Sequence, residues 1–268
     1  MTEMFVLPKM DAAGSWLAPP ERLMLNNDEV HIWCASLEMT SSQVKTMENI
    51  LSADELSRAG RYYFPKHRDH FIAARGLLRT ILGRYAGKNP EDLQFSYGPN
   101  GKPELTEETG GNFRFNISHS HGLSLFAVTL NRDAGVDLEY INSDLSVGDL
   151  AEQFLSPREL LAFKAVPEHG RPRAFFTAWT RKEACLKAQG RGLSADLRQL
   201  EVFPASACQC KFPEKMRGPG QKESPWLLMD LAVLPEYAAA LAVEGNDLQY
   251  KFWQWRMPDQ TGNKSKLI

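Results

Sequence analysis

The sequence predicts an α+β fold built from two similar halves, which we expect to be related by a pseudo-twofold axis with the functional site in the cleft between them. Three observations support this prediction. One motif recurs at a fixed offset, and the same order of elements (a strand, a short helix, a long helix and further strands) is predicted in both halves of the chain. Acidic residues occupy matched positions in the second half only.

The repeat has an offset of 104 residues, which carries Leu51 to Leu155. Leu51-Ser-Ala-Asp-Glu-Leu56 recurs as Leu155-Ser-Pro-Arg-Glu-Leu160. Three further pairs fall in the same register: 71–75 with 175–179, Asp92-Leu93 with Asp196-Leu197, and the apolar strand at 30–33 with 134–137. These matches without a gap indicate a duplication, and so long a period is typical of two homologous domains rather than of a solenoid.

We expect an N-terminal subdomain at residues 1–130, a C-terminal subdomain at 131–257 and a flexible tail at 258–268. The register places three pairs of residues opposite one another: Trp33 and Asp137, Ala35 and Glu139, and Arg79 and Glu183. The second half therefore carries three carboxylates where the first half has none. This asymmetry predicts a single site, with acids from the second half and basic groups from the first.

Gly135-Val-Asp137-Leu-Glu139 is predicted to be a strand. Residues two apart in a strand point to the same side, so Asp137 and Glu139 project together. Two adjacent carboxylates repel one another unless a cation or a shared proton lies between them. The alternative is that this pair forms the solvated face of an edge strand.

Trp179-Thr-Arg-Lys182-Glu183-Ala-Cys-Leu-Lys187 is predicted to be a helix, because it contains good helix formers without Gly or Pro. Trp179 and Glu183 are four residues apart and share one face. With the acidic pair of the strand, Glu183 would complete an oxygen-rich site for a hard ion such as Mg2+, and the nearby lysines suit a phosphate held by that ion. The alternative for Glu183 and Lys187 is an exposed salt bridge worth only tenths of a kcal/mol.

The first half is predicted to contain a long helix at residues 66–85. Arg68, Arg75 and Arg79 lie along one edge of its apolar stripe, as either a solvated rim or an anion cradle. Residues 113–129 are predicted to form two strands around a polar turn, Asn116-Ile-Ser118-His119-Ser120-His121-Gly122. The serines of this turn are candidate phosphate donors, and its histidines are either ligand-binding or ordinary surface residues.

Three other segments are predicted to be irregular. Gly98-Pro-Asn-Gly101-Lys102-Pro103 is a loop in which proline stiffens the residue after Lys102. Residues 204–225, rich in Lys, Gly and Pro, are predicted to be a mobile insertion, and 258–268 a loose tail.

Length and composition exclude several classes of protein. The chain has 268 residues, 43% of them hydrophobic and 24% charged, which is ordinary for a soluble globular protein. A formal net charge of −2 argues against a dedicated nucleic-acid binder. The most uniform apolar run, at 237–243, is too short to span a membrane, and the start of the chain lacks the regions of a secretory signal. Four cysteines without zinc-ligand spacing indicate reduced thiols, so we expect a cytoplasmic protein.

These motifs resemble those of the 4'-phosphopantetheinyl transferases of the surfactin-synthetase-activating (Sfp) type, and most of all those of the cyanobacterial members. The resemblance extends from about Asp28 to Arg256. It depends on four segments in the order of the family: Gly101-Lys-Pro103, Phe115-Asn-Ile-Ser-His-Ser120, Gly135-Val-Asp-Leu-Glu139 and Trp179-Thr-Arg-Lys-Glu-Ala-Cys-Leu-Lys187. The last two are the most specific. Members of this family fold as two similar α+β halves around a cleft, in agreement with the repeat.

The resemblance implies an enzyme that transfers 4'-phosphopantetheine from coenzyme A to a serine of an apo acyl or peptidyl carrier protein and releases 3',5'-ADP. It implies that Asp137, Glu139 and Glu183 hold Mg2+ on the pyrophosphate. Glu183 is implied as the general base, directly or through a water, with Glu139 as a second candidate. The implied phosphate ligands are Lys187 on the transferred or leaving phosphate, His119 on the diphosphate, and Arg75, Lys102 and Arg58 on the nucleotide, with Arg79 in the same cradle.

The sequence leaves two alternative functions. A hydrolase would use Ser118 or Ser120 with a neighbouring histidine and Asp137, but the chain lacks the Gly-x-Ser-x-Gly elbow. A non-catalytic module would bind only carrier proteins or nucleotides, but it gives no reason for acids in one half alone. Because a duplicated chain makes its cleft without a second copy, we expect a monomer. The basic residues predicted to steer an acidic carrier protein are Arg158, Lys164, Arg171 and Arg173.

Overall fold

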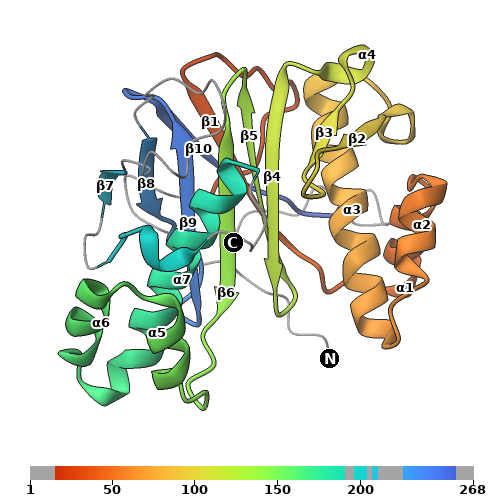
Figure 1. Cartoon of the computed structure of the whole chain (residues 1–268). Coiled ribbons are helices and arrows are strands. Elements are labelled where there is room, and N and C mark those ends of the chain that lie inside the picture. Colours follow the sequence, from red (N-terminus) through yellow and green to blue (C-terminus); the bar gives the residue numbers. More distant parts are fainter. Residues whose placement is uncertain (1–15, 191–195, 204–206, 211–225, 258–268) are drawn as a thin grey trace.

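The structure, a computed structural model, describes residues 16–190, 196–203, 207–210 and 226–257. The predicted tail at 258–268 and most of the predicted insertion at 204–225 lie outside these residues. The chain combines helices with mainly antiparallel sheets, so the predicted α+β class is confirmed (Figure 1). Among the described helices, none has both the length and the apolar composition that crossing a lipid bilayer requires.

The two halves contain their elements in a similar order. The first half contains β1 (Glu29–Ser36), α1 (Ser41–Glu48), α2 (Ala53–Ala59), α3 (Pro65–Ala86), η1 (Pro90–Asp92), β2 (Phe95–Tyr97), β3 (Pro103–Leu105), α4 (Glu107–Gly110), β4 (Phe113–Ser120) and β5 (Leu123–Leu130). The second half contains β6 (Ala134–Tyr140), α5 (Gly148–Phe154), α6 (Pro157–Lys164), η2 (Glu168–Gly170), α7 (Arg171–Ala188), η3 (Leu197–Gln199), β7 (Ala207–Cys210), β8 (Trp226–Asp230), β9 (Tyr237–Glu244) and β10 (Gln249–Gln254). In each half a strand precedes two short helices, one long helix, a 3-10 turn and further strands.

Two four-stranded sheets form the centre of the molecule. One has the strand order β10-β1-β5-β4 and the other β6-β9-β8-β7. Neighbours are antiparallel, except that β1 and β10 are parallel. β2 and β3 form a separate hairpin. The strand β10 comes from the end of the described chain, yet it pairs with β1, so the sheet of the first half includes residues that the sequence assigned to the second half.

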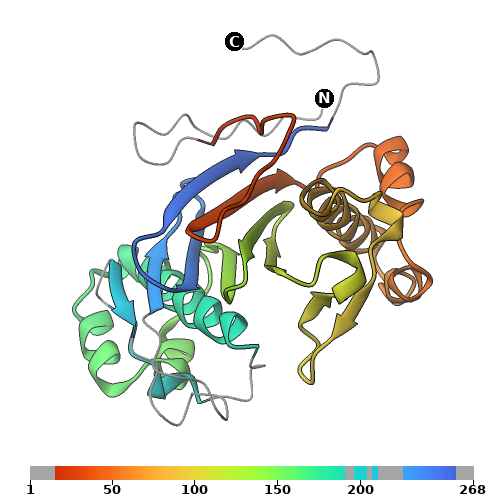
Figure 2. The same cartoon turned by 90° about the horizontal axis from the view of Figure 1, so that it is seen from above.

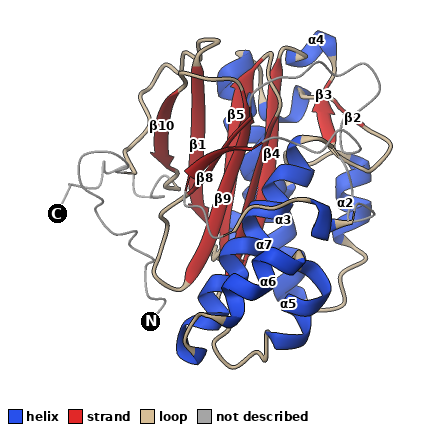
Figure 3. Ribbon diagram, turned by 60° about the vertical axis from the view of Figure 1, so that its left-hand side comes forward, coloured by secondary structure: helices blue, strands red, loops and turns tan. Residues whose placement is uncertain are grey.

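The inner faces of the two sheets share one apolar cluster, and the long helices cover the opposite faces (Figures 2 and 3). The alternation along β1 shows this division. Ile32 and Cys34 belong to the cluster shared with β6 and β9, whereas Trp33 and Ala35 pack in the cluster of α3. In the other sheet, Ala240 of β9 packs in the cluster of α7. Because successive strand residues point to opposite faces, each strand contributes to two layers of the core.

The two sheets lie against each other along β4 and β6, where polar side chains bond to the backbone. The backbone N–H of Val136 donates to Oδ1 of Asn116 at 2.9 Å, and that of Tyr140 donates to Oγ of Ser120 at 3.1 Å. Asn116, Ser118 and Ser120 are spaced two apart, so all three point toward β6. We call this line of contact the seam. It fixes the position of β6 relative to β4.

The repeated motif marks the same helix start in both halves. At the start of α2, the carboxylate of Glu55 accepts a hydrogen bond from the backbone of Ser52, and at the start of α6 that of Glu159 accepts one from the backbone of Ser156. Both arrangements are capping boxes. A capping box satisfies backbone N–H groups that the first turn of a helix leaves without partners.

The structure corrects two predicted boundaries. The polar turn between β4 and β5 is shorter than predicted, because residues 116–120 lie within β4 and only His121 and Gly122 form the turn, with φ values of 43° and 80°. The polar character that suggested a loop comes instead from strand residues at the seam. Residues 207–210, within the predicted insertion, form the strand β7 on β8.

Candidate active site

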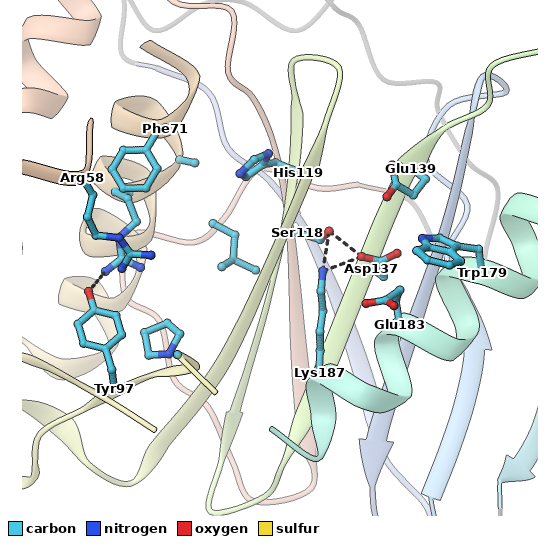
Figure 4. A pocket seen from close by; sticks show the side chains of 15 residues that line it. Arg58, Phe71, Tyr97, Ser118, His119, Asp137, Glu139, Trp179, Glu183 and Lys187 are labelled. Atoms are coloured by element: carbon cyan, nitrogen blue, oxygen red, sulfur yellow. Dashed lines mark hydrogen bonds and ion pairs between the residues drawn. The ribbon is translucent and has the colours of Figure 1, made fainter. Parts of the chain in front are cut away.

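A cavity of about 450 Å³ lies over the seam, with α3 on one side and β6 and α7 on the other (Figure 4). Its first-half wall carries cations and aromatic rings, and its second-half wall carries carboxylates. Most of the site residues predicted from the sequence line it together: Arg58, Arg75, Ser118, His119, Asp137, Glu139, Glu183 and Lys187. Trp179, which the sequence placed on the same helix face as Glu183, also lines it.

The second-half wall brings three acids together. Asp137 and Glu139 project from alternate positions of β6, and Glu183 projects from α7. Oδ2 of Asp137 and Oε1 of Glu183 are buried and have no hydrogen-bond partner among the described residues. Burial, together with the charges of Asp137 and Glu139, raises the pKa of Glu183 to about 7. Burial and Asp137 also raise the pKa of Glu139. Such a group of acids is unfavourable until a cation or a proton binds to it.

Lys187 supplies part of the positive charge that these acids need. Its Nζ donates to Oδ1 of Asp137 at 2.6 Å and to Oγ of Ser118 at 2.9 Å. The side chain is 28% exposed, so its ammonium group remains accessible from the cavity. This pair joins α7 to β6, whereas the alternative interpretation of the sequence placed Lys187 in an exposed salt bridge with Glu183.

The strand β4 lies between the two walls, and its residues alternate between them. Ser118 Oγ donates to Oδ1 of Asp137 at 2.9 Å, and Ser120 Oγ donates to Oε2 of Glu139 at 3.1 Å. His119 lies on the other side of the strand, toward the first-half wall (Figure 4). His119 is exposed to the cavity, and the surrounding protein atoms, followed by the nearby charge of Lys187, lower its pKa. Its imidazole is therefore neutral near pH 7 and offers one N–H donor.

The first-half wall combines two guanidinium groups with aromatic rings. Arg58 is exposed and lies 5.5 Å from the centroid of the Tyr97 ring. Arg75 is buried, lies 4.9 Å from the centroid of the Phe95 ring and donates through Nε to Oε1 of Glu55 at 2.7 Å. Glu55 and the ring hold Arg75 in place, so an anion at this wall meets one buried and one exposed cation.

Three predicted cations of the first half lie outside the lining of the cavity. Arg79 is 1% exposed, and it donates to Oε2 of Glu55 at 2.6 Å and to two backbone carbonyls after α3. Arg68 pairs with an acid of α1. Lys102 donates to the carbonyl of Ala188 at 3.1 Å. The predicted cradle of three arginines therefore brings only Arg75 to the cavity, and Lys102 connects its loop to the end of α7.

The second-half wall fits a divalent cation. Mg2+ takes oxygen ligands, most often carboxylates, and Asp137 and Glu183 each have a buried oxygen without a partner. Across the part of the chain that the structure describes, no three His, Cys, Asp or Glu side chains are already arranged as a ligand set. The three acids would therefore have to turn toward one another as an ion binds.

Sequence reasoning missed several residues of the site. Tyr97 lies on the short strand β2, and no pattern in the sequence marks it as a site residue. Phe71 was expected only as part of the apolar stripe of the long helix. Tyr97 and Phe71 nevertheless line the cavity. Glu55 was noticed only as part of the repeat, although its capping-box spacing from Ser52 was a signal that it would be held in place.

Comparison with known protein families gives two matches. Residues 133–242 match the 4'-phosphopantetheinyl transferase superfamily, and residues 36–130 match the family described as 4'-phosphopantetheinyl transferase, N-terminal. The chain is 41% identical over 244 residues to the 4'-phosphopantetheinyl transferase HetI of Nostoc sp. strain PCC 7120, which covers 90% of this chain and 98% of HetI.

Similarity to relatives from Bacillus subtilis is lower. A 4'-phosphopantetheinyl transferase of this species is 26% identical over 61% of this chain and 71% of its own length. The 4'-phosphopantetheinyl transferase Sfp of strain 168 is 25% identical over 58% of this chain and 66% of Sfp. The match to HetI is nearly complete and agrees with the resemblance seen in the motifs. The chain therefore belongs to the 4'-phosphopantetheinyl transferase family.

Proposed function

We propose that this enzyme transfers 4'-phosphopantetheine from coenzyme A to a serine of an apo acyl or peptidyl carrier protein, with Mg2+ as cofactor and 3',5'-ADP as the second product. One observation carries the proposal: guanidinium groups line one wall of the cavity and carboxylates line the other. Coenzyme A has a matching arrangement of groups. Its phosphorylated nucleotide suits the guanidinium wall, and its pyrophosphate suits a metal ion held by the acids.

The reaction exchanges one phosphorus–oxygen bond for another. The serine oxygen of the carrier attacks the phosphorus that bears pantetheine, the bond to the other phosphate breaks, and 3',5'-ADP leaves with the electron pair. The serine proton passes to a base. This type of transfer depends on positioning and charge neutralisation more than on covalent catalysis, and a serine hydroxyl needs a base beside it.

Asp137, Glu139 and Glu183 would hold the Mg2+, which when bound neutralises charge on the pyrophosphate. The partner-free oxygens of Asp137 and Glu183 support this assignment. The hydrogen bond from Ser120 orients Glu139 in the same wall. The predicted set of three metal ligands is thus proposed unchanged.

Glu183 is our assignment for the general base. A base is most effective when its pKa is near the working pH, and burial together with two neighbouring acids raises the pKa of Glu183 to about 7. A bound cation lowers the pKa of a carboxylate. Proton transfer through a water is therefore the alternative to direct transfer, and Glu139 is the second candidate.

The groups between the two walls are placed to bind phosphates. Lys187 supplies an ammonium beside the acids, and neutral His119 supplies an N–H donor on the side of the nucleotide. Ser118 adds a hydroxyl that contacts both Lys187 and Asp137. These contacts argue against a hydrolase that uses Ser118, because Ser118 is hydrogen-bonded to a lysine and an acid rather than to a histidine. Ser120 Oγ lies 3.4 Å from Nδ1 of His121, but it donates to Glu139 rather than to the Asp137 of that alternative.

The nucleotide end of coenzyme A is assigned to the first-half wall. Arg58 is exposed and suits the 3'-phosphate, and Arg75 suits a phosphate nearer the acids. Lys102 would reach a phosphate by giving up its bond to the carbonyl of Ala188. Arg79 is not included, because its guanidinium bonds to Glu55 and to backbone.

Two further inferences concern the whole molecule. The repeated order of elements supports a pseudo-twofold relation between the halves, and with it a monomer whose cleft is complete in one chain. A cytoplasmic location is proposed separately, from the cysteine pattern of the sequence. Among the basic residues predicted to steer the carrier protein, Arg158 and Lys164 have side chains that are 83% and 56% exposed. Arg171 and Arg173 donate to backbone carbonyls.

Intact-mass measurement tests the proposal. An apo carrier protein incubated with enzyme, coenzyme A and Mg2+ should gain one phosphopantetheine, and a chelator should prevent the gain. Asp137→Asn should abolish it, whereas Asp149→Asn, which changes an exposed acid of α5, should not. Absence of any gain across a panel of apo carriers, with the enzyme folded and Mg2+ present, would refute the proposal.

A further inference from the structure

A buried lysine anchors the helix that carries the acid Glu183. Lys182 and Glu159 have no exposed side-chain surface, and Nζ of Lys182 lies 2.7 Å from Oε2 of Glu159. The same Nζ donates to the carbonyls of Leu197 and Leu200, the residues that begin and follow the 3-10 turn η3. Lys182 thereby joins α7 to the start of α6 and to η3.

The first half contains the same arrangement around a different residue. Nε of Arg79 lies 2.6 Å from Oε2 of Glu55, the capping-box acid of α2. Its Nη1 donates to the carbonyls of Pro90 and Leu93, the residues that begin and follow the 3-10 turn η1. Each half thus contains the same network, in which a cation of the long helix binds a capping-box glutamate and two backbone carbonyls at a 3-10 turn.

The two anchors differ by one position along the helix. In the register of the repeat, Arg79 corresponds to Glu183, and Lys182 corresponds to Leu78, which is fully buried in the core. One residue in an α-helix corresponds to a rotation of about 100° around the axis. Because Lys182 provides the anchor in α7, position 183 is free to carry a carboxylate that faces the cavity.

Position 179 in the second half is likewise not needed to bind the capping-box glutamate. Arg75 bonds to Oε1 of Glu55 in the first half, and its counterpart in the register is Trp179. In the second half, Oε1 of Glu159 accepts hydrogen bonds from backbone N–H groups after η3 instead, at 2.7 and 3.1 Å. Trp179 is therefore free to line the cavity beside the acids.

We propose that Lys182 is a positioning residue for the acidic wall: its contacts with Glu159 and with the carbonyls of Leu197 and Leu200 set the rotation of α7 that turns Glu183 and Trp179 into the cavity. This inference rests on the proposed function, because it assumes that Glu183 binds the metal ion. Lys182 itself does not line the cavity, so it acts through the helix rather than by touching the substrate.

Two variants of the full chain test this proposal: Lys182→Met, and its matched control Arg79→Met. Each removes one buried cation from the same kind of network, and both should lower Tm. The readouts are Mn2+ binding to the protein without coenzyme A, followed by electron paramagnetic resonance, and steady-state kinetics at a temperature where both variants are folded. We expect Lys182→Met to weaken Mn2+ binding and to lower kcat, each by roughly 10- to 100-fold.

Arg79→Met should keep the Mn2+ affinity, and kcat at saturating coenzyme A, within about threefold of the unchanged enzyme, since Arg79 lies on the other long helix. Its partner Glu55 also bonds to Arg75, so any loss in this variant should appear in the KM for coenzyme A. If Lys182→Met does not fold, Glu159→Gln, which keeps the shape of the acid, replaces it and should weaken Mn2+ binding in the same direction. Equal losses of Mn2+ affinity and kcat in the Lys182 and Arg79 variants, or no such loss in folded Lys182→Met or Glu159→Gln, overturn the positioning role alone. An unchanged enzyme that binds no Mn2+ and modifies no carrier overturns the proposed function and this inference together.

Discussion

Nζ of Lys187 lies 2.6 Å from Oδ1 of Asp137, so the ammonium of α7 already occupies one side of the acidic wall. Two unit charges at this distance interact strongly when water is partly excluded. Lys187 therefore stabilises the acids of the metal-free enzyme, and under the proposed function it would also compete with the metal ion for Asp137. The first effect is measured as the stability of the metal-free enzyme and the second as its affinity for a metal ion, so the two can be measured separately.

We predict that Lys187→Met binds Mn2+ more tightly than the unchanged enzyme, by roughly tenfold, because a repelling charge is removed. We also predict that its kcat falls by at least about 100-fold, because the charge of the transferred phosphate is no longer neutralised. Electron paramagnetic resonance and steady-state kinetics measure the two effects. Lys187→Arg, which keeps the charge, should show little of the first effect. Weaker Mn2+ binding by Lys187→Met would contradict the competition.

The raised pKa of Glu183 predicts a gain in stability when its charge is removed. The pKa is about 7 in the folded protein and 4.5 as the ordinary value. The folded state therefore holds the proton more tightly, and ionisation of Glu183 costs stability fully above pH 7, partly between pH 4.5 and 7, and not at all below 4.5. In the presence of a chelator, Glu183→Gln should be more stable at pH 8 by on the order of 2–3 kcal/mol.

Urea unfolding at pH 8 and pH 5 measures this effect, and the gain should shrink as the pH is lowered. Glu108→Gln serves as a control, since its acid is exposed and lies outside the cavity lining. A loss of stability in Glu183→Gln at pH 8 would show that the acidic wall is not under electrostatic strain.

The exposed position of Arg58 predicts a defect specific to the 3'-phosphate of coenzyme A. Arg58→Ala should raise the KM for coenzyme A by about tenfold, the value of one charge-assisted contact, with kcat little changed. The KM for 3'-dephospho-coenzyme A should not change, because that substrate lacks the group Arg58 is assigned to bind. Arg61→Ala, which changes an exposed neighbour outside the cavity lining, is the control. An equal rise in KM for both substrates would show that Arg58 does not bind the 3'-phosphate.

The packing of α7 on β6 predicts that Gly135 cannot be replaced. A Cβ at this position would lie 2.1 Å from the carbonyl oxygen of Ala184 and 2.3 Å from the backbone nitrogen of Ala188. Because both obstacles are helix backbone, Gly135→Ala should push α7 away from β6 and cost about 3 kcal/mol or more. Gly148→Ala, where no atom lies within 4 Å of the added Cβ, should cost little. Thermal and urea unfolding measure the free energy of unfolding of both variants, and equal values would contradict the prediction.

The sequence predicted the α+β class, and it predicted that the second-half acids lie close together, because both depend on short-range patterns. The alternation that places Asp137 and Glu139 on one side of a strand, and the spacing that places Trp179 and Glu183 on one helix face, are local properties. The single offset of 104 residues then related the two long helices. The four side chains Asp137, Glu139, Trp179 and Glu183 all line the same cavity.

The first-half cations were harder to predict, since their roles depend on partners that are distant in the sequence. Arg75 and Arg79 share a helix edge, yet both bond to Glu55, 20 and 24 residues earlier, and only Arg75 lines the cavity. The polarity of Asn116 and Ser120 suggested a turn, because a single sequence does not reveal that a second strand lies beside them. The sequence predicted that the lysines near Glu183 suit a bound phosphate, but Lys182 is buried against Glu159 and does not line the cavity.

The pairing of β10 with β1 limits how this enzyme is divided into fragments. A cut between residues 130 and 134 separates the covalent halves, but the amino-terminal piece then lacks the strand beside β1 and exposes that edge. A split reporter based on this enzyme would need residues 249–257 transferred to the amino-terminal fragment by circular permutation, or supplied as a separate peptide. The strand β10 therefore links the end of the second half to the sheet of the first half.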